Sequence, residues 1–220
     1  MMNKQLLFEF NSNKSYLSQD YIVSGCNKDA YNMIKSWPLW GKQAYANIFY
    51  IYGSKSCGKT HLCSIWGEKS HSHLLSLEHD IMEQLANHEN FVIEDIEQYL
   101  IDEEKILHIF NLIIEMKKYL LITSNQHPSK LNISLADLRS RFNAINAIII
   151  ENPDDELLKI MISKLFAERQ LRISQDIVKY IINHSNRSLE HICHIIQKLD
   201  DISLSSRKHI TVKMIKDLLL

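Results

Sequence analysis

A short segment of the chain has the residue types and the spacing that bind phosphate groups. The phosphate-loop pattern G-x-x-x-x-G-K-[ST] is matched at every position by Gly53-Ser54-Lys55-Ser56-Cys57-Gly58-Lys59-Thr60. In such a loop, successive backbone N–H groups surround a phosphate, and the positive end of the following helix faces it. We therefore predict that this loop, with His61 after it, binds a nucleotide, that Lys59 reaches the β- and γ-phosphates and that Thr60 binds Mg²⁺.

Two carboxylates and an amide stand where further apolar segments end. Glu94 and Asp95 follow Phe91-Val92-Ile93, and Asn125 follows Leu120-Leu121-Ile122-Thr123-Ser124. Parallel strands present their carboxyl ends at one edge of a sheet, where acids can meet a metal beside the phosphate loop. We predict that Glu94 and Asp95 are catalytic acids and that Glu94 also binds Mg²⁺, directly or through water. Asn125 is predicted to take part in catalysis by orienting a water or sensing the γ-phosphate. Asn125 also fits a simple turn, because Asn is a common turn residue.

The elements that would position these residues alternate along the chain. Strand patterns cover 46–52, 73–77, 91–95, 119–125 and 147–150, and helical patterns cover 27–37, 59–70, 80–86, 103–118 and 135–142. This alternation predicts an α/β fold, a parallel sheet with helices on both faces. Beyond Pro153, helices are expected at 154–169, 174–183 and 188–199, and a segment at 209–215 leads into a helical end at 216–220. We expect a tail at 1–20, a nucleotide-binding α/β domain at 21–152 and a small all-α lid at 153–220.

For two of the expected helices, the sequence also predicts which residues form the buried apolar face. Asn27 is expected to cap a helix whose apolar face includes Ala30, Ile34 and Trp37. A wider apolar face is expected for the 103–118 helix. Its members are Ile106, Leu107, Phe110, Ile113, Ile114 and Met116.

Composition sets the broad class of protein. The chain has 220 residues and a formal net charge of −1, so no strong overall field attracts it to nucleic acid or membrane. No apolar run is long enough for a membrane span, and the first residues lack a signal-peptide pattern. The cysteines are scattered without a C-x-x-C pair, which disfavours zinc and a disulfide framework. A cytoplasmic protein is expected, and for Cys57 a small tolerated loop residue is favoured over redox control.

A peptide near the N-terminus has a pattern of its own. Gln5-Leu6-Leu7-Phe8 places a glutamine before large apolar side chains. One interpretation is a strand or tail against the core. The other is a short peptide that inserts Leu and Phe into a partner's pocket, and it resembles the Q-L-x-L-[FP] peptides that bind the bacterial DNA polymerase sliding clamp.

Taken together, the motifs resemble those of AAA+ ATPases, and within them the DnaA family, over about residues 20–215. The resemblance implies a three-layer AAA+ domain with ADP or ATP and Mg²⁺ as cofactors. The segment at 21–30 resembles the family's adenine-surrounding segment and assigns Val23 and Asn27 to the nucleotide. Leu121-Ile122-Thr123-Ser124-Asn125 resembles sensor I, and Asn186-Arg187-Ser188-Leu189-Glu190 resembles sensor II, so Arg187 would reach the phosphates. Leu138-Arg139-Ser140-Arg141-Phe142 resembles box VII and makes Arg141 the finger presented to a neighbouring subunit.

The chain differs from the replication initiators of the DnaA family in several features, and these differences indicate which members it resembles most. The chain ends without their helix-turn-helix region, and the span between Leu77 and Phe91 leaves no room for their helical wedge. The remaining pattern is most similar to the Hda-type regulators, which implies DnaA and the sliding clamp as partners, with a homodimer possible and any DNA contact weak or indirect. Glu94 stands where the family usually has Asp, and Asp95 is shorter than the usual hydrolytic Glu, so weak intrinsic ATPase activity is expected.

Three alternatives stay open at this point. The chain could be a self-sufficient ATPase, such as a helicase loader of the DnaC type. It could be a nucleotide-independent scaffold in which the loop no longer binds nucleotide. Arg141 could be a structural residue that forms a salt bridge within its own subunit.

Overall fold

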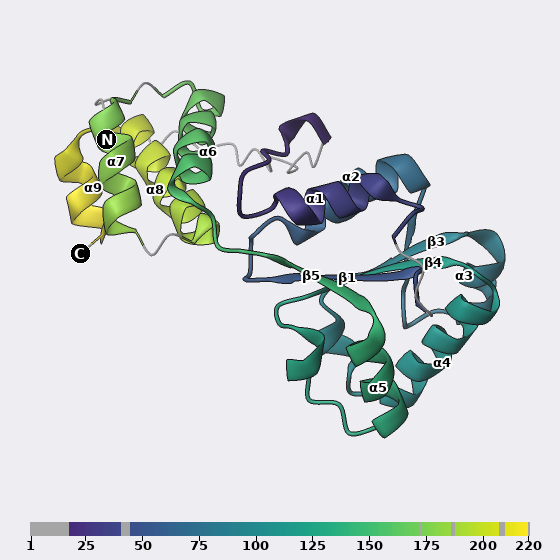
Figure 1. Ribbon diagram of the computed structural model, residues 1–220. Coiled ribbons are helices and arrows are strands. Elements are labelled where there is room, and N and C mark those ends of the chain that lie inside the picture. Colours follow the sequence, from purple (N-terminus) through teal and green to yellow (C-terminus); the bar gives the residue numbers. More distant parts are fainter. Residues whose placement is uncertain (1–17, 41–44, 172, 186–187, 207–209, 220) are drawn as a thin grey trace, which may run out of the picture.

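The computed structural model describes residues 18–40, 45–171, 173–185, 188–206 and 210–219, and it shows a parallel sheet between two helical layers, with a group of helices to one side (Figure 1). The sheet has five strands in the order β2-β3-β4-β1-β5, and every neighbouring pair is parallel. The strands are β1 (Ile48–Gly53), β2 (His73–Leu74), β3 (Asn90–Ile93), β4 (Tyr119–Ser124) and β5 (Asn146–Ile150). The predicted α/β class is confirmed.

The helices divide into those of the sheet and those that follow it. The first set is α1 (Lys28–Ser36), α2 (Lys59–Ser70), α3 (Ile81–Asn87), α4 (Glu103–Glu115) and α5 (Ala136–Ala144). Short 3₁₀ helices are η1 (Ser18–Asp20), η2 (Ile96–Tyr99) and η3 (Pro128–Lys130). The second set is α6 (Asp155–Glu168), α7 (Gln175–His184), α8 (Leu189–Ser206) and α9 (Val212–Leu219).

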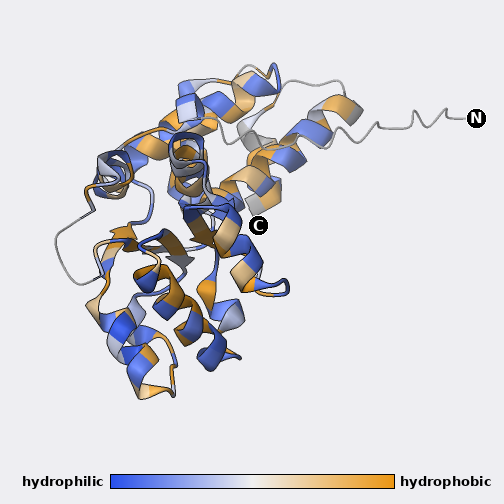
Figure 2. Cartoon of the chain, turned by 90° about the vertical axis from the view of Figure 1, so that its right-hand side faces the viewer, coloured by the Kyte–Doolittle hydropathy of each residue, from blue (hydrophilic) through white to orange (hydrophobic). Residues whose placement is uncertain are grey.

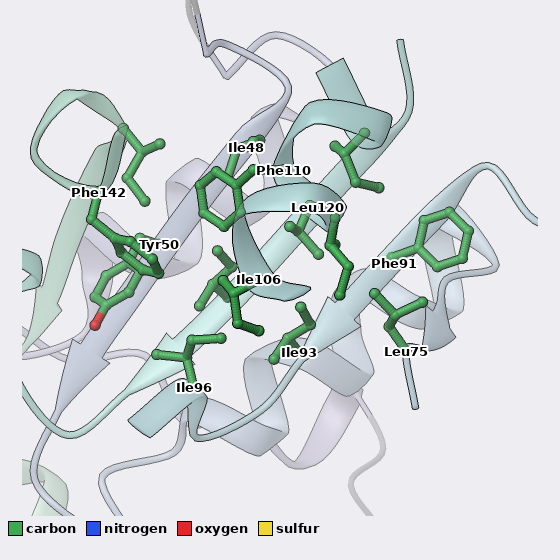
Figure 3. Packing of buried hydrophobic residues seen from close by; sticks show 14 of the residues in the cluster. Ile48, Tyr50, Leu75, Phe91, Ile93, Ile96, Ile106, Phe110, Leu120 and Phe142 are labelled. Carbon is green, nitrogen blue, oxygen red and sulfur yellow. The ribbon is translucent and has the colours of Figure 1, made fainter. Parts of the chain in front are cut away.

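Alternation along β1 explains the two layers. Successive strand side chains point to opposite faces of a sheet. Phe49 and Ile51 pack with residues of α1 and α2 on one face, whereas Ile48 and Tyr50 pack with residues of α4 and α5 on the other. Figure 3 shows this second face. Because both faces are covered, nearly every residue of the central strands β1, β3 and β4 is buried, and most of these residues are apolar, as expected for a buried parallel sheet.

The helices α6–α9 have an apolar core of their own. Leu158, Phe166, Ile181 and Ile196 are buried in it, together with other residues of the same helices. Hydrophilic and hydrophobic residues alternate around these helices (Figure 2), as expected for helices that bury one face. No described helix is both long enough and apolar enough to cross a membrane.

Several element boundaries differ from the sequence prediction. Strand pairing at the second segment covers only His73 and Leu74, although Leu75 still donates a backbone hydrogen bond to Val92. The helix α4 ends at Glu115, and Met116 is partly exposed, so its predicted place on the apolar face is wrong. The last helix begins at Val212, earlier than the predicted 216.

Candidate nucleotide site

The carboxyl ends of three neighbouring strands bring the predicted site residues together. In the sheet β1 lies beside β4 and β4 beside β3. The phosphate loop follows β1, Asn125 follows β4, and Glu94 follows β3. Residues that are far apart in sequence therefore meet at one edge of the sheet, as the sequence predicted from the strand pattern.

Lys59 lies at the centre of this edge. Its side chain is buried, and Nζ donates to the backbone oxygens of Gly53 at 2.9 Å and Ser54 at 3.1 Å. It also donates to Oδ1 of Asn125 at 2.9 Å. The ammonium is the donor in all three contacts, and it can donate in the same way to phosphate oxygens. The residues present therefore fit a nucleotide phosphate.

The loop backbone has the conformation that a close phosphate contact needs. Gly58 has φ of 106°, a value that side chains rarely permit, and it stands immediately before α2. Ser56 also has a positive φ, 64°. A Cβ on Gly53 would come within 2.5 Å of the Ile150 backbone oxygen, so this first glycine permits the close approach of β1 and β5.

Thr60 and Glu94 form the candidate metal site. The Thr60 hydroxyl donates to Oε2 of Glu94 at 2.6 Å. A hydroxyl and a carboxylate oxygen this close are hard ligands of the kind that Mg²⁺ prefers. The neighbouring Asp95 has φ of 48°, and its backbone N–H donates to the Thr123 hydroxyl at 3.0 Å. The Asp95 backbone is thus held in a strained conformation at the sheet edge.

Asn27 has a different local role from the predicted one. It occupies the position before α1 but makes no side-chain hydrogen bond to the helix. Its Oδ1 instead accepts from the Ser24 backbone N–H at 2.9 Å, and its Nδ2 donates to the Ile22 oxygen at 2.9 Å. The capping prediction is wrong because the side chain closes the preceding loop. Val23 lies exposed within that loop.

Sequence reasoning did not assign Tyr21 to the site. Its ring stacks on Tyr31 with 5.7 Å between centroids and meets His61 edge to face at 5.0 Å. A Cβ on Gly58 would come within 3.3 Å of this ring. Burial raises the pKa of the Tyr21 hydroxyl far above its usual range, so the group stays protonated. Tyr21 is the first residue of the 21–30 segment that resembles the adenine-surrounding segment, and this position was the available signal.

Glu97, on η2, was also missed. Its Oε1 accepts from the Asn125 backbone N–H and from the Ser124 hydroxyl, each at 2.5 Å. The E-D-I-E run places Glu97 close after the acid pair, but nothing in that run indicates contact with the next strand.

The remaining loop residues have structural contacts. The Cys57 thiol is buried, and burial raises its pKa, which disfavours a reactive thiolate. Lys55 forms an ion pair of 3.2 Å with Glu190 at the beginning of α8. The Ser54 hydroxyl donates to Asn152 at 3.0 Å. Both contacts connect the phosphate loop to the region that carries the second helical set.

Arg141 lies on α5, outside the group formed by Lys59, Thr60, Glu94 and Asn125. Its guanidinium makes two hydrogen bonds of 3.3 Å to the Asp137 carboxylate one turn earlier. The Asp137 side chain is largely exposed, whereas that of Arg141 is only 18% exposed. The pair agrees with the alternative of a salt bridge within the subunit.

Two groups of predicted residues lie outside the described part of the chain. Arg187, predicted to reach the phosphates, is one of them. The N-terminal peptide Gln5, Leu6, Leu7 and Phe8 is the other. Their roles stay predictions.

Comparison with known proteins gives two kinds of similarity in sequence. A family model described as "Hda, lid domain" matches residues 154–219. An uncharacterized protein of Haemophilus influenzae is 28% identical over 78% of this chain and 81% of its own length. The chromosomal replication initiator protein DnaA of Geobacter metallireducens is 25% identical over 96% of this chain and 52% of its own length. The chain thus spans about half the length of that DnaA.

Solved structures show the same fold. Domain III of the Thermotoga maritima replication initiation protein DnaA has a TM-score of 0.75 at 20% identity, covering 94% of this chain and 96% of that one. The AMPPCP-bound DnaA of Aquifex aeolicus has a TM-score of 0.69 at 21% identity, covering 88% and 67%. The sheet, the phosphate loop and the helices that follow therefore have the arrangement of an AAA+ domain and its helical lid.

Proposed function

The chain is a DnaA-family AAA+ protein related to Hda, and from this premise we propose that it is an Hda-like regulator that binds adenine nucleotide and stimulates ATP hydrolysis by DnaA. The match of the Hda lid model to residues 154–219 carries the proposal. In it, residues 21–152 are the nucleotide domain, 153–220 the lid and 1–20 the tail that contacts the clamp.

The nucleotide part of the proposal rests on the contacts at the sheet edge. Lys59 would bind the phosphates of ADP or ATP, and Thr60 and Glu94 would hold Mg²⁺. The ion, when bound, neutralises phosphate charge. Asn125 accepts from Lys59 and so lies within reach of the same phosphates. A DnaA structure similar to this chain is bound to AMPPCP, which supports an adenine nucleotide here.

The regulatory part of the proposal assigns Arg141 to a partner DnaA subunit. Among the described residues, the Arg141 guanidinium pairs with Asp137 on the same helix and makes no hydrogen bond to the phosphate loop of its own subunit. In the proposed complex the guanidinium exchanges the exposed Asp137 carboxylate for the γ-phosphate held by DnaA. Arginine fingers of this type contribute about 10³–10⁵-fold to the rate in other NTPases.

Replacement of Arg141 tests the finger, and Arg139 supplies a matched control on the same helix. Arg141→Ala is expected to remove most of the stimulation of DnaA ATP hydrolysis in the presence of clamp and DNA. The variant is expected to fold, and thermal unfolding is measured beside the parent because the Arg141 side chain is only 18% exposed and its stem contributes packing. Arg139 donates to the Ile133 backbone oxygen, and Arg139→Ala should retain stimulation. Full stimulation by Arg141→Ala would refute the finger.

Clamp binding is tested separately. Deletion of residues 1–10 is expected to abolish binding to the purified sliding clamp while leaving nucleotide affinity unchanged. Undiminished clamp affinity would refute the peptide assignment and leave the finger proposal standing.

A second candidate function is ATP hydrolysis by this chain alone. The Thr60–Glu94 hydrogen bond favours this candidate because it places one of the two acids at the candidate metal site. Steady-state turnover without DnaA distinguishes the two functions. Turnover of this chain alone at the rate of the mixture with DnaA would favour the self-sufficient ATPase.

A further inference from the structure

Glu97 connects the ends of two strands at the nucleotide site. Its Oε1 accepts from the Asn125 backbone N–H and from the Ser124 hydroxyl at 2.5 Å each. Asn125 in turn accepts from Lys59 Nζ at 2.9 Å through its side-chain oxygen. One carboxylate oxygen therefore holds the backbone from which the partner of Lys59 projects.

The position of Asn125 depends on this contact because the sheet no longer supports it. The last pair between β1 and β4 is Tyr52 with Ser124, so Asn125 lies beyond the ladder. Asn125 is exposed, and its side-chain oxygen accepts from Lys59. Glu97 supplies the hydrogen bond that the next strand pair would otherwise have made.

The surrounding contacts make this strand end rigid. The Ser124 hydroxyl accepts from the Gln126 backbone N–H at 3.0 Å. The Tyr50 hydroxyl, whose ring is buried in the core, donates to the Gln126 backbone oxygen at 3.0 Å. The turn that carries Asn125 is thus fixed on both sides, by Glu97 before it and by Tyr50 after it.

Packing alone does not account for a glutamate at this position. The second carboxylate oxygen, Oε2, is buried and has no hydrogen-bond partner among the described residues. A buried acceptor without a hydrogen-bond partner lowers the stability of the fold. A side chain selected for stability alone would therefore have both oxygens hydrogen-bonded, or would carry no carboxylate.

We propose that Glu97 is a positioning residue of the nucleotide site: it fixes the backbone N–H of Asn125 and thereby sets the Asn125 amide beside Lys59, where both meet the terminal phosphate of a nucleoside triphosphate. This inference rests on the proposed nucleotide binding. It adds that recognition of the third phosphate depends on a residue that does not itself contact the nucleotide.

Two substitutions distinguish the effect of the Glu97 side-chain length from the effect of its negative charge. Glu97→Gln keeps an acceptor oxygen at the same distance from the backbone but removes the charge. Glu97→Asp keeps the charge but shortens the side chain by one methylene, so the carboxylate no longer reaches Asn125. A positioning role predicts that the Gln variant resembles the parent and the Asp variant does not, whereas an electrostatic role predicts the reverse.

The measurement is affinity for ADP and for a nonhydrolysable ATP analogue with Mg²⁺, by titration calorimetry on the full chain. Glu97→Asp is expected to weaken analogue binding by about tenfold, the effect of one charge-assisted hydrogen bond. Its ADP affinity should stay within about twofold of the parent, because ADP lacks the third phosphate. A purely structural defect would weaken both nucleotides alike.

Asn125→Ala completes the test. This residue is exposed, so the variant is expected to fold and to show the same selective loss of analogue affinity. Adding Glu97→Asp to Asn125→Ala should cause no further loss, since Glu97 acts through Asn125. Additive losses, equal losses for both nucleotides, or parental analogue affinity in either single variant would overturn the inference. A parent chain that binds neither nucleotide would overturn the proposed function itself.

Discussion

Replacing Gly58 with alanine tests the geometry of the phosphate loop most directly. Gly58 has φ of 106°, and a residue other than glycine held in such a region costs about 1–3 kcal/mol. The added Cβ would also lie 3.3 Å from the Tyr21 ring, which would then have to shift. We expect Gly58→Ala to lower the free energy of unfolding by about 1–3 kcal/mol, and for a chain of this size each kcal/mol lowers Tm by about 2–4 °C. Nucleotide affinity should fall as well, because the ring and the loop move together.

Gly67 is the matched control, on the helix that follows Gly58. It lies within α2, and a Cβ there would meet only the Ser72 hydroxyl oxygen at 3.3 Å, the end of a side chain that can rotate. Gly67→Ala should therefore stabilise the helix, by up to about 1 kcal/mol, and leave nucleotide affinity unchanged. Urea unfolding and nucleotide titration of both variants provide the assay. If Gly58→Ala were as stable as the parent, or if Gly67→Ala were the more damaging change, the strain assigned to Gly58 would be refuted.

Two further predictions concern one buried and one partly buried charged group. Lys59→Met should weaken ADP binding by about 10–100-fold, because charge-assisted hydrogen bonds to phosphate are lost. Lys118 is the control: it is also buried, but its Nζ contacts His88 and Glu89. Lys118→Met should leave ADP affinity unchanged in the same titration. Burial raises the pKa of the Asp200 carboxyl, although Arg169 lies 3.7 Å away. Ionisation of Asp200 therefore costs more in the folded state than in the unfolded state. The protonated carboxyl contributes stability at low pH, and this contribution is lost as pH rises through the folded-state pKa of Asp200. Asp200→Asn should therefore be more stable than the parent at neutral pH, with the difference disappearing at low pH in thermal unfolding, and a difference independent of pH would contradict this.

Local sequence patterns were sufficient for most of the secondary structure. The strand at β4 and the helix α5 each lie within about two residues of their predicted bounds, because their apolar periodicity is strong and polar residues flank them. The errors fall at element ends. Met116 has the spacing of the apolar face of α4, but the helix ends at Glu115. The spacing of apolar residues does not show where a helix ends.

The same patterns identified the site only in part. Lys59, Thr60, Glu94 and Asn125 were found because the phosphate loop has a distinctive spacing and because parallel strands end at one edge. Asn27 was identified as a residue of interest, but its hydrogen bonds to Ser24 and Ile22 depend on a loop conformation that spacing does not specify.

What the sequence determined by itself is therefore the chemistry available at the site: a phosphate loop, two acids and an amide on successive strands. The tertiary structure decided which of these groups touch. Thr60 meets Glu94 and Lys59 meets Asn125 because β4 lies between β1 and β3. The contact of Glu97 with Asn125 and the place of the Tyr21 ring over Gly58 were visible only in the fold. The physical reason is that a motif records neighbours along the chain, whereas these contacts join residues whose proximity is set by strand order and by packing between layers.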